Sequence, residues 1–342
     1  MPHERAMRDW RRSGMATVMP AAWASALTRF AVLIAAVMLM SAREWAEMIH
    51  QWWNIDTYSH ILIIPFIIAW LVMMRREDLA KITPAAWWPG TLPFAAAIAL
   101  WLLGRVTGLN LLAHAGAIGA LQAGAVLVFG PRVALLLALP IGFAAFMVPF
   151  GDELIPALQI VTAKIAIALT HFSGVDGRID GIHIFTPAGL FIVAEACSGV
   201  KFTMAMVALG TLVCFTRFDS WHRRAIFMAA CIIVPIIANG VRAWGTIFVA
   251  QSQGAEFAAG VDHIVYGWIF FAIIIAIMIG GAWRYFERAP EDAGLSLATV
   301  ENLSIPFAHG DRDRFGAIAI PVALAIAGAG WIAAIYLAPT IR

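Results

Sequence analysis

Residues 225–250 read AIFMAACIIVPIIANGVRAWGTIFVA, an apolar run long enough to cross a bilayer as one helix. Its outward half carries Arg242, with Asn239 three residues earlier. An arginine inside such a span costs roughly 2.5–3.5 kcal/mol on insertion scales, so an intramembrane arginine is a candidate functional residue. The stretch therefore predicts a membrane helix and places a candidate site on it.

Similar apolar runs recur along the chain. Of its 342 residues, 62% are apolar and 13% are charged, and the mean hydropathy is +0.83. A soluble domain carries about 25% charged residues, so a water-soluble fold is excluded. We predict an all-α polytopic membrane protein with about nine transmembrane helices, over residues 30–42, 60–74, 90–103, 111–130, 131–149, 198–216, 225–250, 264–283 and 316–338.

One long segment, residues 150–197, interrupts the alternation of spans and short loops. Its part 155–173 mixes apolar residues with polar ones, which indicates an amphipathic helix along the membrane interface. Glycines then separate two β-prone runs, 182–185 and 191–193, which predict a short hairpin or a re-entrant segment before Cys197.

The chain divides into four expected regions. They are a cytoplasmic N-terminal segment (1–29), a transmembrane catalytic domain (30–288), a cytoplasmic linker (289–315) and a C-terminal span (316–342). No cleavable signal peptide is evident, so we expect the first span to remain as an anchor.

The distribution of cations predicts the orientation. With the N-terminus in the cytoplasm, most of the 23 Lys and Arg lie on the cytoplasmic side, as the positive-inside rule requires. They are Arg5, Arg8, Arg11, Arg12, Arg29, Arg75, Arg76, Lys81, Arg132, Arg217, Arg223, Arg224, Arg284, Arg288, Arg312 and Arg314. These clusters are short and flank spans, so we expect no nucleic-acid partner. We predict a bacterial inner-membrane location.

Three chemically capable residues fall at the outer ends of three consecutive predicted spans: Cys197, Arg242 and His263. Each has an ordinary explanation, since Cys197 suits a small buried position, Arg242 can snorkel to the interface, and His263 can be a solvated residue beside a helix cap at Asp262. Their shared depth favours a site. The other two cysteines, Cys214 and Cys231, are expected to be packing residues.

The pattern suits acyl transfer by a thiol. Cys197 precedes an apolar helix whose N-terminal N–H groups favour a thiolate and an oxyanion, and Lys201 adds positive potential. Histidine exchanges protons near neutral pH, and Asn239 lies on the same helical face as Arg242. A thiolate that attacks a peptide carbonyl, an arginine that stabilises the oxyanion and a histidine that protonates the leaving amine form a minimal set.

Three segments resemble the signature blocks of the exosortase/archaeosortase family, in that family's order: VAEACSGVKF (193–202), ANGVRAWG (238–245) and VDHIVYGWIFF (261–271). DTYSHILIIPFI (56–67) resembles the family's second-span motif, with Ile61 where a glycine is usual. The closest similarity is to the exosortase A subgroup, over roughly residues 30–288.

The resemblance implies a catalytic triad of Cys197, Arg242 and His263. We count Glu195, Lys201, Asn239 and Asp262 as accessory, and Tyr58, Ser59 and His60 as substrate-proximal. It also implies membrane-anchored partner substrates with a C-terminal Pro-Glu-Pro (PEP-CTERM) sorting signal, linked to exopolysaccharide and biofilm-matrix systems. The active site would face the periplasm, with either water or an amine resolving the acyl-enzyme.

The sequence also allows other functions. A transporter or polysaccharide-export component would use Arg242 and His263 as a polar path, but the mid-span carboxylates of a proton relay are missing. A rhomboid-type serine protease lacks a nucleophilic serine motif, and a structural assembly factor leaves Arg242 unexplained. No paired metal-ligand spacing is present, so we expect no metal and no cofactor. The oligomeric state stays open.

Overall fold

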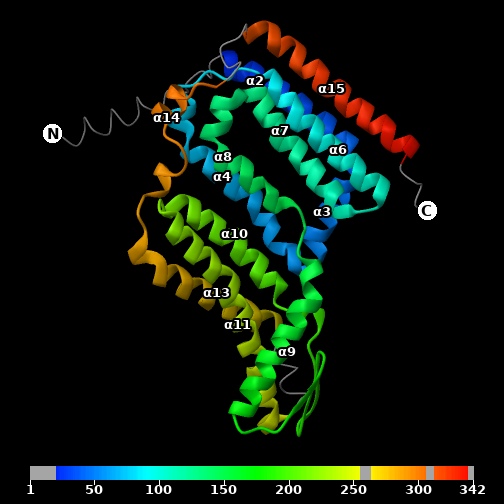
Figure 1. Cartoon of the computed structure of the whole chain (residues 1–342), viewed down its shortest axis with the longest axis vertical. Helices are drawn as coiled ribbons and strands as arrows, with labels where there is room; N and C mark the ends of the chain where they lie inside the picture. Colours follow the sequence, from blue (N-terminus) through cyan, green and yellow to red (C-terminus); the bar gives the residue numbers. More distant parts are fainter. Residues whose placement is uncertain (1–20, 255–262, 306–311, 338–342) are drawn as a thin grey trace, which may run out of the picture.

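The computed structural model describes residues 21–254, 263–305 and 312–337. Within these ranges eight helices are long and apolar enough to cross a membrane, and the only sheet is a small one. The chain is therefore an all-α polytopic membrane protein, as its composition predicted. Figure 1 shows the helices in two groups, one above the other along the longest axis of the molecule.

The upper group in Figure 1 is built from four long helices. α2 (Ala21–Met40), α6 (Thr91–Thr107), α7 (Asn110–Leu136) and α15 (Arg312–Leu337) bury a shared apolar core around Leu33, Trp101 and Leu127. α6 and α7 form a hairpin across Gly108, whose positive φ of 74° suits glycine. The hairpin packs closely, because a Cβ at Gly116 would lie 2.3 Å from the backbone nitrogen of Trp101.

The connection from the first to the second span is itself helical. α3 (Ala42–Asn54) buries Trp45, Met48 and Trp52, and its other face carries polar residues. η1 (Asp56–Ile63) then leads into α4 (Ile64–Met74), α5 (Arg76–Leu79) and η2 (Trp88–Gly90). This arrangement places the start of η1 beside the lower group of helices.

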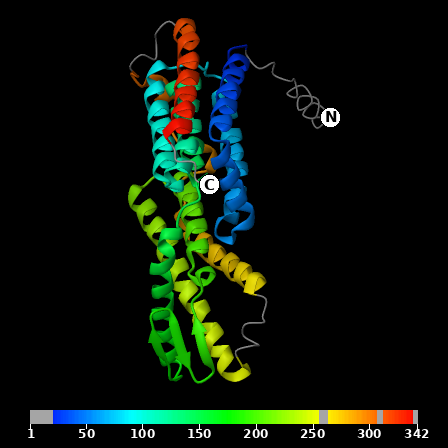
Figure 2. The same cartoon turned by 90° about the vertical axis from the view of Figure 1, so that its right-hand side faces the viewer.

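The lower group contains α9 (Ile155–Phe172), α10 (Val200–Arg217), α11 (Trp221–Gln253) and α13 (His263–Ala282). α8 (Ala138–Phe143), η3 (Ala144–Met147) and η4 (Asp152–Leu154) carry the chain into it from α7. α9 and the end of α11 run side by side to the lower tip, with the sheet against them (Figure 2).

The sheet has three antiparallel strands in the order β1 (Arg178–Asp180), β2 (His183–Thr186) and β3 (Gly189–Ile192). Its inner face presents Ile179, Ile184 and Phe191 to an apolar cluster with α9 and α11. The hairpin alternative for this segment is therefore confirmed, with one additional strand. β3 leads through η5 (Glu195–Cys197) into α10.

The structure differs from the predicted elements in three places. The span predicted over 131–149 is not one helix, because α7 is kinked at Gly130 (φ 82°), followed by Pro131, and the chain turns again at Leu137. The segment 155–173, predicted to be an amphipathic interfacial helix, lies in α9, which is long and apolar enough to span a membrane. The first span, predicted from residue 30, is already helical at Ala21.

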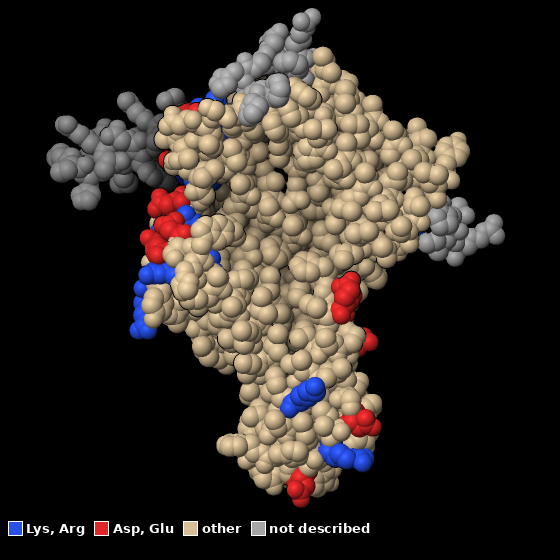
Figure 3. Space-filling model, in the orientation of Figure 1, with Lys and Arg blue, Asp and Glu red and all other residues tan. Residues whose placement is uncertain are grey.

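Charged side chains gather at the left-hand edge of Figure 3, and the centre of that face is almost free of them. At this edge the α10–α11 connection meets the segment after α13, which contains η6 (Trp283–Tyr285) and η7 (Pro290–Asp292). Glu287 accepts hydrogen bonds from the backbone N–H groups of Asp219 and Ser220, and Arg288 pairs with Asp219 at 2.8 Å. α14 (Leu297–Asn302) follows and leads toward α15.

Candidate active site

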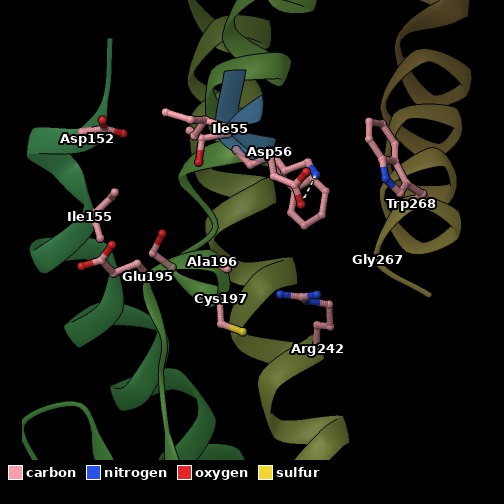
Figure 4. A pocket seen from close by; sticks show the side chains of 14 residues that line it. Ile55, Asp56, Asp152, Ile155, Glu195, Ala196, Cys197, Arg242, Gly267 and Trp268 are labelled. Atoms are coloured by element: carbon pink, nitrogen blue, oxygen red, sulfur yellow. Dashed lines mark ion pairs between the residues drawn. The ribbon is translucent and has the colours of Figure 1, made fainter. Parts of the chain in front are cut away.

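A cavity of about 450 Å³ opens where the two groups of helices meet. Its walls come from η1, η4, α9, η5, α10, α11 and α13, so segments far apart in the sequence converge on it (Figure 4). The lining residues are Ile55, Asp56, Thr57, Asp152, Ile155, Glu195, Ala196, Cys197, Ser198, Lys201, Phe202, Arg242, Gly267 and Trp268. Cys197 and Arg242, both predicted site residues, therefore share one cavity.

Cys197 lies in a tight connection between β3 and α10. Its N–H donates to Ala194 O in η5, and Gly199 then adopts a left-handed φ of 87° before α10 begins at Val200. Ser198 Oγ accepts a bond from Val200 N at 3.4 Å. The half-buried thiol thus lies three residues before the helix, and Lys201 and Phe202 of its first turn line the cavity with it. Figure 4 shows the Cys197 sulfur on the side of the cavity that faces the Arg242 guanidinium group.

Asn239 joins the thiol segment to two helices. Its Nδ2 donates to Cys197 O at 2.8 Å and to Thr162 Oγ1 at 3.0 Å, and its Oδ1 accepts from Arg242 Nη2 at 3.3 Å. Thr162 Oγ1 donates to Ser198 O at 3.2 Å. Gly199 packs so closely on Asn239 that a Cβ there would lie 2.9 Å from the amide. Asn239 is only 2% exposed, so this buried network leaves little freedom in the backbone that carries the thiol.

Arg242 is 8% exposed and lies on the cavity wall. Besides its bond to Asn239, its guanidinium group stands 5.7 Å from the Phe202 ring centroid, and a Cβ at Gly267 would lie 3.5 Å from Nη1. Its buried Nε has no hydrogen-bond partner among the described residues. A guanidinium group on the wall of a cavity carries charge-assisted donors that suit an oxyanion.

A second cation, Lys201, also lines the cavity. Lys201 Nζ pairs with Asp56 at 3.6 Å and stands 4.6 Å from the centroid of the Trp268 ring (Figure 4). Asp152 and Glu195 line the cavity on the side away from Arg242. Asp152 and Glu195 therefore lie at one end of the cavity, and Arg242 lies beside the thiol at the other.

The other predicted site residues lie around this cavity or outside the described part. His263 begins α13, one helical turn before Gly267, and its side chain is not described; Asp262 lies outside the described residues. Tyr58, Ser59 and His60 follow the lining residues 55–57 in η1, but their side chains are not among those that line the cavity. The Tyr58 hydroxyl hydrogen-bonds to Asp152, which does line it.

Sequence reasoning missed several contributors, among them Thr162, Asp56 and Trp268. Thr162 falls in the segment that the sequence predicts to be an interfacial helix, and its hydroxyl bonds to Ser198 and Asn239 inside the protein. Asp56 and Trp268 stand within the quoted segments 56–67 and 261–271, and only their convergence on the cavity reveals a role. Cys214 and Cys231 are buried at 2% and 0% exposure in a separate apolar cluster, as expected for packing residues.

Fold and cavity together define a class: a polytopic helical membrane protein with a thiol and an arginine in one partly buried cavity at the end of its spans. The family model described as transmembrane exosortase (Exosortase_EpsH) matches residues 52–280, which include every lining residue of the cavity. The chain therefore belongs to the transmembrane exosortase family. Searches of curated proteins and of solved structures return no match.

Proposed function

We propose that this protein is a cysteine transpeptidase or protease that removes C-terminal Pro-Glu-Pro sorting signals from membrane-anchored exported proteins. The carrying observation is that Cys197 and Arg242 line the same cavity, linked through Asn239. Family membership supports a sorting-signal substrate. Exopolysaccharide and biofilm-matrix systems are the expected setting of such substrates.

The proposed reaction has two acyl transfers. The Cys197 thiolate attacks the scissile carbonyl carbon, and Arg242 stabilises the oxyanion that forms. The carbon–nitrogen bond breaks, His263 gives a proton to the leaving amine, and a thioester remains on Cys197. Water or an acceptor amine then attacks the thioester, losing its proton to His263, and releases the thiolate.

We place this reaction at the periplasmic face of the inner membrane, with the N-terminus in the cytoplasm. The support is the cation asymmetry of the sequence. The charged edge formed by Arg223, Arg288 and Glu287 belongs to the opposite ends of α10, α11 and α13 from Cys197. Introduced cysteines between residues 150 and 190 test the orientation in a variant without native cysteines. Labelling by an impermeant thiol reagent in intact cells is expected, and labelling only after lysis would contradict the orientation.

The test of the function is co-expression with a membrane-anchored reporter that ends in a Pro-Glu-Pro sorting segment. Cys197→Ala should abolish removal of the reporter's C-terminal helix while the enzyme still accumulates in the membrane. Cys214→Ala with Cys231→Ala is the matched control, because these thiols are buried away from the cavity, and it should process the reporter. Processing by Cys197→Ala would remove the nucleophile assignment.

A further inference from the structure

The strand that leads to the thiol lies at one edge of its sheet. β3 pairs with β2 on one side, and the strand order is β1-β2-β3. From Ile192, the last residue of β3, the chain reaches Cys197 in five residues, at most about 17 Å of backbone. A polypeptide held along this edge would be close to the cavity and its thiol.

The pairing register shows which backbone groups face outward. Ile182 O accepts from Val193 N, so Ile182 and Val193 form a hydrogen-bonded pair. Such pairs alternate in an antiparallel ladder, which makes Ile184–Phe191 the next one. Leu190 and Ile192 therefore direct their N–H and C=O groups away from β2. Among the described residues no backbone hydrogen bond joins the N–H of Leu190 or Ile192 to a group outside the sheet, and β3 pairs with no strand besides β2.

The side chains of the same two residues are also open. Leu190 is 51% and Ile192 54% exposed, whereas Phe191 between them packs inward toward α9 and α11. On β2 the neighbour opposite Leu190 is Phe185, which is 36% exposed. The outer face of the sheet thus offers apolar side chains next to an edge with unmatched backbone groups, a combination that suits an added strand.

We propose that the substrate polypeptide binds in extended form as a fourth strand along β3, with backbone hydrogen bonds to Leu190 and Ile192, and enters the cavity at Cys197. This rests on the proposed function. An extended peptide fits better than a helix, because only an extended backbone presents unpaired N–H and C=O groups at the spacing of the edge. Backbone pairing also tolerates many sequences, so several substrates with a common signal would bind in one register.

The first test removes single backbone donors. Leu190→Pro and Ile192→Pro delete the outward N–H groups at an edge position, where proline is tolerated. Each should lower the rate of reporter processing about tenfold. This corresponds to the upper end of the range of about 0.5–1.5 kcal/mol for one hydrogen bond. Leu190→Ala and Ile192→Ala keep the N–H and should process within about threefold of wild type. Proline variants that match their alanine counterparts would overturn the proposal.

The second test needs no catalysis. In an enzyme with Cys197, Cys214 and Cys231 all changed to Ala, Leu190→Cys or Ile192→Cys should form disulfides with a reporter that carries single cysteines upstream of its sorting segment. Cross-linking should alternate along the reporter with the two-residue period of a strand. Disulfides between two enzyme copies in place of the reporter, or no periodicity, would refute strand addition.

The processing assay and the cross-linking assay together distinguish the proposed function from the proposed docking mode. If Cys197→Ala still processes the reporter, the nucleophile assignment fails, whereas periodic cross-linking to β3 can still occur. If Cys197 is essential but the proline variants process normally, the proposed function stands and the docking mode is wrong.

Discussion

Two of the closely packed helix pairs in this protein use their contacts differently. α6 and α7 approach through glycines, since a Cβ at Gly104 would lie 2.3 Å from the Ala113 nitrogen. α9 and α11 also meet at a glycine, Gly240 against Ile165, but they add the buried bond from Asn239 to Thr162. The first pair relies on close packing, as small residues permit in a membrane.

This difference distinguishes the α6–α7 pair, which supports the fold, from the α9–α11 pair, which positions the candidate active site. A buried polar group is costly unless it is hydrogen-bonded, so a polar network inside a membrane protein marks a place where position matters. In the α9–α11 pair the network extends to the backbone of Cys197 and to Arg242. We therefore expect changes in the α6–α7 pair to affect stability and changes in the α9–α11 pair to affect reaction rate.

The largest expected effect concerns Arg242. Arg242→Lys should be nearly as damaging as Arg242→Ala, because lysine keeps the charge but cannot supply several donors of a planar fork at once. Loss of one oxyanion donor lowers the rate by about 10²–10³, or roughly 2.7–4 kcal/mol. The measurement is the fraction of reporter processed per unit time, normalised to the enzyme in the membrane. Near-wild-type rates for Arg242→Lys would reduce the arginine to a general electrostatic role.

A change in the α6–α7 pair should lower the stability of the fold. Gly116→Val forces a Cβ into the Trp101 backbone, so α6 and α7 must separate, at a cost of about 1–3 kcal/mol or more. Thermal unfolding in detergent should show a lower midpoint, and the surviving folded fraction should process the reporter normally. Gly119→Ala is the matched control on the same helix, because its Cβ would make an ordinary contact at 3.5 Å. Equal midpoints for the two variants would contradict tight packing here.

A smaller effect is expected at Thr162. Thr162→Val removes the hydroxyl that accepts from Asn239 and donates to Ser198 O, leaving buried groups unmatched at about 1–3 kcal/mol. Processing should slow, and the alkylation rate of Cys197 should change because its backbone loses support. Thr162→Ser should restore both. Thr170→Val is the control, since that buried hydroxyl bonds only within α9, to Ala166 O. A similar loss of processing in both valine variants would argue against a positioning role.

The smallest expected effect is the pH response at the charged edge. Hydrogen bonds from the N–H groups of Ser220 and Asp219, with Arg223 nearby, lower the pKa of the Glu287 carboxyl. A lowered pKa means that Glu287 stabilises the fold above its unfolded value of about 4.3 and loses this contribution as the pH falls through the folded value. Unfolding midpoints of wild type should therefore fall more below about pH 4.3 than those of Glu287→Gln. Parallel curves would contradict the assignment.

The sequence predicted the membrane fold because composition and apolar runs follow directly from the bilayer as solvent. It placed Cys197 and Arg242 in one site because both fall at the ends of consecutive spans. It predicted the helix over 155–173, which is α9, but not that this helix is long and apolar enough to span a membrane, since Gln159 and Thr162 suggested a wet surface. In the structure Gln159 Nε2 donates to Val193 O and Thr162 to Ser198 O, so these polar groups support the thiol segment. The partners of Gln159 and Thr162 lie 34 and 36 residues away in the chain, so the local sequence gives no sign of these hydrogen bonds.

The prediction of one span over 131–149 was wrong for another reason. Its apolar character was read correctly, but Gly130 and Pro131 kink the helix and Leu137 turns it again. Hydropathy indicates whether a segment prefers the membrane or water, and it does not detect such breaks in a helix. The direction of the chain between α7 and α9 therefore had to come from the structure.

The central claim is that Cys197 forms a thioester with the substrate. The direct measurement is acid quenching during reporter turnover, followed by a search for a covalent enzyme–reporter adduct and treatment with neutral hydroxylamine. We expect an adduct on Cys197 that hydroxylamine cleaves to a hydroxamate and the free thiol, and no such adduct with Cys197→Ala. An adduct that persists in Cys197→Ala, or one that resists hydroxylamine, would contradict the account.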